Sequence, residues 1–269
     1  MPELPEVQTV VNNIQPLIKN KVFLSYHQSW EKVLYSDNFK EISDTINNKK
    51  VEDVYRIGKY IIIELYEYYI AFHLRMTGYL HTSKNKNINK YVRCYFKFSD
   101  NTFLIYEDIR KFGGFYYIKN LNSIKNKLGI EPLSEQFKFN WVSDNLKIKK
   151  RQIKALLLDQ SFIVGLGNIY IDEILWSSKI HPLSLSNMIR ESQIKQFISN
   201  TKRILKDSIN FHGTTIINFK FDNMRTGKYR KKLKVYNRKD QSCLRCNKKI
   251  IKIKVSSRGT YICPFCQII

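Results

Sequence analysis

Two short stretches, Cys243-Leu244-Arg245-Cys246 and Cys263-Pro264-Phe265-Cys266, decide how the last part of this chain folds, and sixteen residues separate them. Each pair of thiolates fits on a tight turn, and two such turns close a tetrahedral Zn²⁺ site. No His or carboxylate is spaced to leave an open coordination position. The pattern therefore predicts one structural zinc ion held by Cys243, Cys246, Cys263 and Cys266.

The residues between the two cysteine pairs predict a β-hairpin with Arg258 at its turn. A guanidinium at a turn presents a fork of donors that suits a phosphate, although a solvated turn arginine is the alternative. Zinc ribbons bind DNA, RNA and proteins, so the zinc site by itself does not define a function.

The charge balance narrows the class of partner. The chain has 269 residues, with 46 Lys and Arg against 23 Asp and Glu, which gives a net charge of +23. Such an excess favours a polyanionic partner, with nucleic acid first, over a small-molecule substrate. The alternative is a basic bias in a chain that is also rich in Asn, Ile and Lys. No signal peptide and no membrane-length apolar run is visible, so we expect a cytoplasmic, nucleoid-associated protein without a membrane partner.

The first half of the chain predicts a helix followed by a β-sandwich. Val7, Val10, Val11 and Ile14 have helical spacing within 4–18. Short runs rich in β-branched and aromatic residues follow, and 82–90 is a polar loop. Cys94 lies on the apolar side of the run 92–98 and is interpreted as a core thiol. The predicted strands are 51–57, 59–66, 69–75, 92–98, 102–106 and 114–119.

The second half predicts helices, near 134–147, 151–160, 168–178 and 187–209. A Gly-x-Gly-Asn turn, 165–168, lies between two of them, and Asn168 is placed to cap the second. A helix N-terminus of this kind can hold a phosphate without reading sequence, although an ordinary helical corner is the alternative.

Two turns and the N-terminus carry residues suited to work on a duplex. Met76 and the Arg110–Phe112 turn could fill the hole that an extruded base leaves, or Met76 and Phe112 could belong to the core. Pro2, once Met1 is removed, would have a secondary amine able to form an iminium, with Glu3 as proton carrier. The alternative for Pro2 and Glu3 is an ordinary helix start.

Taken together and in order, these motifs resemble the formamidopyrimidine-DNA glycosylase (Fpg, MutM) family over essentially the full length. The resemblance implies a bifunctional glycosylase and abasic-site lyase that excises oxidised purines from duplex DNA by β,δ-elimination. It implies an α+β fold: an N-terminal β-sandwich lobe with a flanking helix (1–131), a helical lobe with a helix–two-turn–helix (132–232) and a zinc-ribbon hairpin (233–269). The motifs are 2–7, 58–60, 73–78, 110–113, 158–160, 165–170, 180–182 and 258–267.

The resemblance also implies residue roles. Pro2 would be the nucleophile and Glu3 would protonate the opening sugar, with Glu6 in support. Lys59 would complete the catalytic set by contacting the phosphate beside the lesion. The remaining positions would contact DNA, with Arg110 facing the orphaned cytosine: Asn168 and Arg258 on phosphates, Met76, Arg110 and Phe112 in the vacated stack, and Lys154 near the lesion. The expected partner is duplex DNA with oxidised bases, bound by a monomer.

Some positions depart from the family pattern. Ile130, Asn237, Asp240 and Ser242 replace residues that are usually proline or glycine, which indicates loop changes. The segment 213–232 resembles the loop that caps the flipped base, but it is unusually basic, so lesion ranking is not transferred. Three alternatives stay open: an endonuclease VIII-like enzyme for oxidised pyrimidines, which Leu4 and Val7 disfavour, a non-catalytic zinc-ribbon binder, and a ribosome-associated basic protein.

Overall fold

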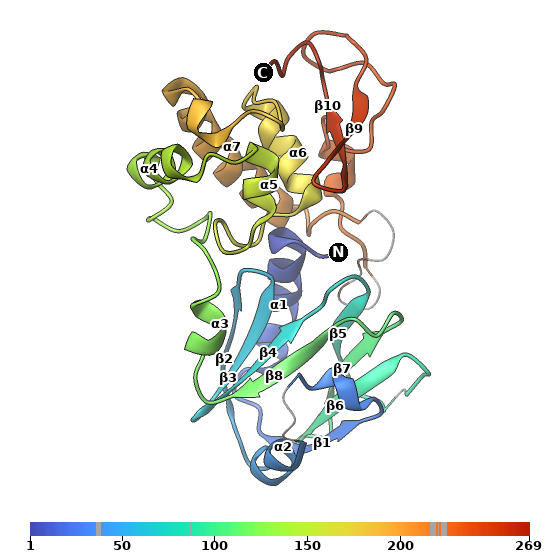
Figure 1. The fold of residues 1–269 in the computed structure, drawn as a ribbon. Coiled ribbons are helices and arrows are strands. Elements are labelled where there is room, and N and C mark those ends of the chain that lie inside the picture. Colours follow the sequence, from blue (N-terminus) through green and yellow to red (C-terminus); the bar gives the residue numbers. More distant parts are fainter. Residues whose placement is uncertain (36–38, 87, 216–218, 220, 222–224) are drawn as a thin grey trace. The chain divides into compact units, whose positions relative to one another are not determined.

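The computed structural model describes all residues except 36–38, 87, 216–218, 220 and 222–224 (Figure 1). The chain divides into two compact units. Unit 1 contains residues 1–125 and 211–228, and unit 2 contains residues 126–210 and 229–269. The segment 211–228 therefore belongs to the same unit as the β-sandwich. None of the described helices is long and apolar enough to cross a membrane.

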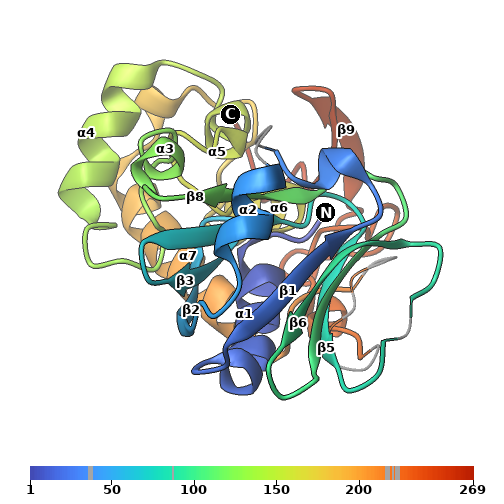
Figure 2. The same cartoon turned by 90° about the horizontal axis from the view of Figure 1, so that it is seen from below.

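Unit 1 contains two four-stranded antiparallel sheets, with strand orders β1-β6-β7-β5 and β2-β3-β4-β8. Figure 2 shows β1 beside β6 in the first sheet, in which β7 lies between β6 and β5. Apolar side chains from both sheets share one core, which includes Phe23, Phe72 and Phe96. The strands are β1 Phe23–Gln28, β2 Val51–Ile57, β3 Tyr60–Leu65, β4 Tyr68–His73, β5 Gly78–Ser83, β6 Val92–Phe98, β7 Phe103–Asp108 and β8 Gly114–Ile118.

Helix α1 (Leu4–Ile18) flanks the sandwich, as predicted, and contacts β2, β3 and β5. Its apolar stripe, including Val7, Val11 and Ile14, is buried in the shared core. The start of the chain is therefore held rigidly against the sheets. The other helical segments of unit 1 are η1 Glu31–Val33, α2 Phe39–Thr45 and α3 Asn122–Lys125.

The predicted β-sandwich is confirmed, but two strands were missed for physical reasons. In β1 every third residue is buried and the register shifts between Phe23 and Ser25, so the two-residue alternation of a strand is absent. Strand β5 lies at a sheet edge and begins with Gly78, which is typical of a turn. It also extends into the start of the predicted loop 82–90.

Unit 2 is helical and ends in the predicted hairpin. The helix–two-turn–helix consists of α5 (Ile153–Leu158) and α6 (Asn168–Ser177), and Trp176 at the end of α6 packs on the cysteine-rich finger. The other elements are α4 Phe139–Lys149, η2 Ser186–Met188, α7 Glu191–Asn210, η3 Tyr229–Lys232, β9 Ile251–Val255 and β10 Arg258–Ile262.

Candidate active site and nucleic-acid interface

The start of α1 buries two carboxylates beside Pro2. Glu3 is 3% exposed and Glu6 1% exposed, and the Glu3 backbone N–H donates to Glu6 Oε2 at 2.8 Å. Pro2 is also buried, whereas Met1 is 48% exposed. Pro2, Glu3 and Glu6 are therefore buried together at a fixed helix start.

Glu6 also holds the beginning of the predicted base-capping loop. Its second oxygen, Oε1, accepts the backbone N–H of Thr214 at 2.6 Å, and both groups are buried. Further along the loop, Phe221 is 3% exposed within the sandwich core, and Phe219 stacks on its ring. The described part of the loop is thus fixed to unit 1 at two points. Residues 216–218, 220 and 222–224 of the basic stretch lie outside the described residues.

Lys59 lies in the turn between β2 and β3, where its side chain is 5% exposed. Arg56 connects this turn to α1, because its guanidinium donates to Gly58 O at 2.8 Å and to Gln8 Oε1 at 3.1 Å. The structure therefore fixes the turn that carries Lys59 to helix α1, whose N-cap is Glu3.

His73, at the end of β4, is a feature that the sequence analysis did not single out as a site residue. Burial, followed by the charges of Arg75 and Lys59, lowers the pKa of His73 to about 3. Nδ1 accepts the backbone N–H of Arg75 at 3.1 Å, so the ring proton is on Nε2. His73 is thus a neutral donor next to Lys59. In the sequence, nothing distinguishes a buried, neutral histidine of this kind from any other His at the end of a strand.

The proposed wedge side chains lie outside the core. Met76 is 41% exposed and Phe112 is 52% exposed, and Arg110 is exposed beside them with its guanidinium 4.5 Å from the Phe112 ring centroid. Exposed large apolar side chains next to a cation are typical of a surface that a partner covers. The core alternative for Met76 and Phe112 is therefore wrong.

In unit 2 the structure brings Asn168 and the Arg258 turn together. Asn168 is the first residue of α6, and its Nδ2 donates to Gly259 O at 2.9 Å. Arg258 is exposed next to that carbonyl. A helix N-terminus, an amide and a guanidinium therefore lie on one surface, a combination that suits phosphate oxygens.

Lys154 occupies a different environment from the one predicted. It is fully buried, and its Nζ donates to Asp172 Oδ1 at 2.6 Å and to Thr260 Oγ1 at 2.8 Å. Burial raises the pKa of Asp172, and the Lys154 ammonium opposes that rise. The Lys154 contacts join α5, α6 and β10, and a direct contact of Lys154 with DNA would require this ion pair to open.

Glu173 is a further residue that the sequence analysis missed. Its buried carboxylate accepts the backbone N–H groups of Lys234, Val235 and Tyr236 at 2.8–3.0 Å. Burial raises the pKa of Glu173, and these three donors work against the rise. The carboxylate thus fixes the chain on α6 as it enters the finger.

Glu173→Gln is expected to destabilise unit 2, because an amide NH₂ would face backbone donors. The loss is about 2–3 kcal/mol, since hydrogen bonds to a charged group contribute about 1.5–3 kcal/mol. Thermal unfolding followed by circular dichroism measures the effect. Glu191→Gln, at the exposed start of α7, is the matched control and should unfold like the unaltered chain. Equal melting of the Glu173 and Glu191 variants would contradict the anchoring role.

The four predicted zinc ligands form one cluster, with all Sγ atoms within 4.8 Å of one another. The Cys243–Cys266 and Cys246–Cys263 Sγ pairs are 3.9 and 3.4 Å apart. A tetrahedral zinc site with Zn–S bonds of ~2.3 Å requires S···S separations of roughly 3.8 Å, so the cluster fits the ion. Trp176 and Tyr261 pack around it. The zinc site is structural.

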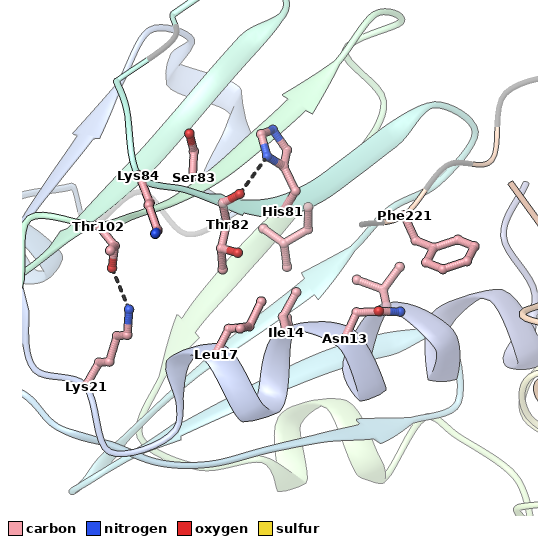
Figure 3. Close-up of a pocket in the computed structure, with 12 residues that line it drawn as sticks. Asn13, Ile14, Leu17, Lys21, His81, Thr82, Ser83, Lys84, Thr102 and Phe221 are labelled. Carbon is pink, nitrogen blue, oxygen red and sulfur yellow. Dashed lines mark hydrogen bonds between the residues drawn. The ribbon is translucent and has the colours of Figure 1, made fainter. Parts of the chain in front are cut away.

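A cavity of about 490 Å³ lies elsewhere in unit 1, between α1 and β5 (Figure 3). Asn13, Ile14 and Leu17 line it from the helix, and the Phe221 ring lies over the same helix near Asn13. Lys21 donates to Thr102 at its far end, at 2.7 Å. None of the predicted site residues lines this cavity.

Three family models match consecutive parts of the chain. They are the formamidopyrimidine-DNA glycosylase N-terminal domain at 1–115, the H2TH domain of the same family at 128–220, and a zinc finger found in FPG and IleRS at 240–268. A β-sandwich, a helix–two-turn–helix and a zinc finger in this order define a DNA glycosylase.

The chain belongs to the formamidopyrimidine-DNA glycosylase family. It is 40% identical to the Lactobacillus helveticus enzyme over 275 residues, covering 100% of this chain and 99% of that relative, and 38% identical to the Mycoplasma pneumoniae enzyme. Lactococcus lactis Fpg bound to DNA containing N7-benzyl-Fapy-dG is similar with a TM-score of 0.91 and 34% identity, covering 99% of each chain. MutM bound to carbocyclic 8-oxo-G DNA gives the same values. The family resemblance of the sequence is confirmed.

Proposed function

We propose that this chain excises oxidised purines, including 8-oxoguanine and formamidopyrimidines, from duplex DNA and then cleaves the abasic strand. The observation that carries the proposal is its full-length similarity to formamidopyrimidine-DNA glycosylases, with Pro2, Glu3 and Glu6 at a buried helix start. Solved relatives are bound to DNA containing Fapy-dG or carbocyclic 8-oxo-G. This supports the oxidised-purine branch over the endonuclease VIII-like alternative.

The chemistry begins at the Pro2 nitrogen after removal of Met1. A terminal amine has a pKa of about 7.7–8.0, so a substantial neutral fraction exists near neutral pH. The neutral amine forms a bond to C1′ while the bond from C1′ to the base breaks, and the departing base takes up the proton that the amine loses. Glu3 donates a proton to the sugar ring oxygen as the C1′–O4′ bond opens to the iminium. The resulting iminium acidifies C2′, so elimination breaks the C3′–O bond and then the C5′–O bond. The product is a one-nucleotide gap with phosphate ends.

The other site residues hold the DNA. Lys59 in unit 1, and Asn168 and Arg258 in unit 2, contact phosphates. Met76, Arg110 and Phe112 fill the stack that the flipped nucleotide leaves, which offsets part of the few kcal/mol lost in unstacking. Lys154 is not included among the phosphate contacts, because it is buried on Asp172. We further propose that the protein acts as a cytoplasmic monomer.

Arg258→Ala is expected to reduce the salt dependence of duplex binding. Each phosphate contact adds about 0.9 to the slope of log K against log salt concentration. Binding to an 8-oxoguanine duplex across a series of salt concentrations measures this slope. Lys254→Ala, an exposed cation in the same hairpin, is the matched control and should leave the slope unchanged. Equal slopes for the unaltered chain and Arg258→Ala would remove Arg258 from the phosphate contacts.

Borohydride trapping on an 8-oxoguanine duplex tests the proposed function. The unaltered chain should give a covalent adduct, and Pro2→Gly should lose most of it. Mass spectrometry of the active protein should show a chain that begins at Pro2. Equal trapping by both proteins would move the nucleophile to a lysine, and no trapping by either would favour a non-catalytic binder. Faster cleavage of thymine glycol than of 8-oxoguanine would favour the endonuclease VIII-like alternative.

A further inference from the structure

Asp108, the last residue of β7, is completely buried. It contacts two turns, one with Met76 and one with Arg110 and Phe112, which we call the wedge turns. Its Oδ2 accepts the backbone N–H groups of Phe112 at 2.9 Å and Gly113 at 2.8 Å. Its Oδ1 accepts the backbone N–H of Arg110 at 3.0 Å. One carboxylate therefore fixes the backbone of the turn that carries both Arg110 and Phe112.

The same carboxylate reaches the second wedge turn. Asp108 Oδ1 also accepts the hydroxyl of Thr77, the residue after Met76. The Arg110 N–H is shared, since it lies 3.2 Å from Thr77 Oγ1 as well. Thr77 and Asp108 thus join two turns that are more than thirty residues apart in the sequence.

Tyr106 completes the junction from the same face of β7, because residues two apart on a strand point to the same side. It is fully buried, and its Oη lies between the two turns. A Cβ added at Gly78 or Gly113 would be 2.6 or 2.0 Å from this oxygen. Both glycines therefore pack directly on the Tyr106 hydroxyl, and any side chain at either position would push the turns apart.

The backbone of Asp108 is itself fixed from β6. Arg93, which is 7% exposed, donates through Nε to Asp108 O at 2.7 Å, and Asp108 N–H donates to Tyr91 O at 2.9 Å. The exposed wedge side chains consequently have a buried, hydrogen-bonded support. A contact group whose support is already ordered loses less conformational entropy when it binds.

We infer that Asp108 and Thr77 are positioning residues that join the two turns into one rigid wedge, so that Met76, Arg110 and Phe112 enter the duplex together. This inference rests on the proposed function. If the turns moved separately, Arg110 would be less accurately placed against the orphaned base. The junction therefore sets how strongly the enzyme discriminates cytosine from adenine opposite the lesion.

Thr77→Val tests the inference, because it removes the hydroxyl while keeping a side chain of similar size. The ratio of kcat/KM for 8-oxoguanine opposite C to that opposite A should fall by about tenfold, as expected for the loss of one hydrogen bond to a charged group. Cleavage of an abasic site in single-stranded DNA should stay within about twofold, because a single strand has no orphaned base to face. Asp108→Asn, which loses half of the acceptor atoms, should reduce the ratio further.

Two variants serve as controls. Thr77→Ser restores the hydroxyl and should restore the ratio. Asp100→Asn alters another turn of unit 1, where Asp100 accepts the N–H and hydroxyl of Thr102, and should leave the ratio unchanged. An unaltered ratio in Thr77→Val would overturn the inference, and so would a parallel loss on single-stranded and duplex substrates. Failure of the unaltered chain on the abasic strand would instead contradict the proposed function.

Discussion

Cys263→Ala is expected to release the zinc ion and to weaken binding to an 8-oxoguanine duplex by at least ~100-fold, because structural zinc supplies folding free energy of about 10–16 kcal/mol. Cys263 is buried in the small core that also holds Trp176 and Tyr261. Without the metal, the hairpin that presents Arg258 is no longer held by the bonds between zinc and the four cysteines. Zinc content by atomic absorption and binding by fluorescence anisotropy measure the two effects.

Cys94 provides a matched control for this experiment. It is also a fully buried cysteine, but it lies in the sandwich core, where burial raises its thiol pKa well above the usual value. Cys94→Ala should lower the free energy of unfolding by about 1–2 kcal/mol and leave zinc content and DNA binding unchanged. Zinc retention by Cys263→Ala, or zinc loss by Cys94→Ala, would contradict the assigned metal site.

Glu3→Gln is expected to slow 8-oxoguanine excision by about 10²–10⁴-fold, the usual contribution of a positioned proton donor. The backbone N–H of residue 3 still meets Glu6, so the helix start is retained. A preformed abasic site has already lost its base, so its cleavage through the Pro2 amine should be much less affected. Single-turnover rates on the two substrates measure this difference.

Glu31→Gln, at an exposed position of the same unit, is the control for Glu3→Gln and should match the unaltered chain on both substrates. Equal slowing of excision and abasic-site cleavage by Glu3→Gln would assign Glu3 to the Pro2 nucleophile rather than to the sugar that opens as the base leaves. An unaltered excision rate would remove Glu3 from the chemistry altogether.

Short-range patterns in the sequence predicted much of this fold. The cysteine spacing, the periodicity of 4–18 and the strands at 51–57 and 92–98 are all local signals, and the structure has elements at each place. Strand β1 lacked such a signal, because its burial repeats every third residue. Strand β5 lacked one because it begins with glycine at a sheet edge.

The supporting residues of the site could not be predicted in this way. Glu173 accepts N–H groups about sixty residues further along the chain, and Asp108 joins turns that are distant in sequence. Every residue type except proline has a backbone N–H group, so the sequence does not mark which of them bind a carboxylate. In the sequence, a buried carboxylate that accepts them therefore looks like any other acidic residue. Lys154 illustrates the opposite case, because its family resemblance indicated DNA while its charge is met by Asp172 on the next helix.

The buried pair of Lys154 and Asp172 constrains how this protein can evolve. Both side chains have 0% exposure, so a substitution of either one strands an uncompensated charge, which typically costs about 3–5 kcal/mol. Replacing both with apolar residues of similar volume is often neutral. Lineages can therefore exchange both residues only together. A chimaera that combines Lys154 or Asp172 with an apolar partner from a relative should misassemble where the hairpin meets its helices.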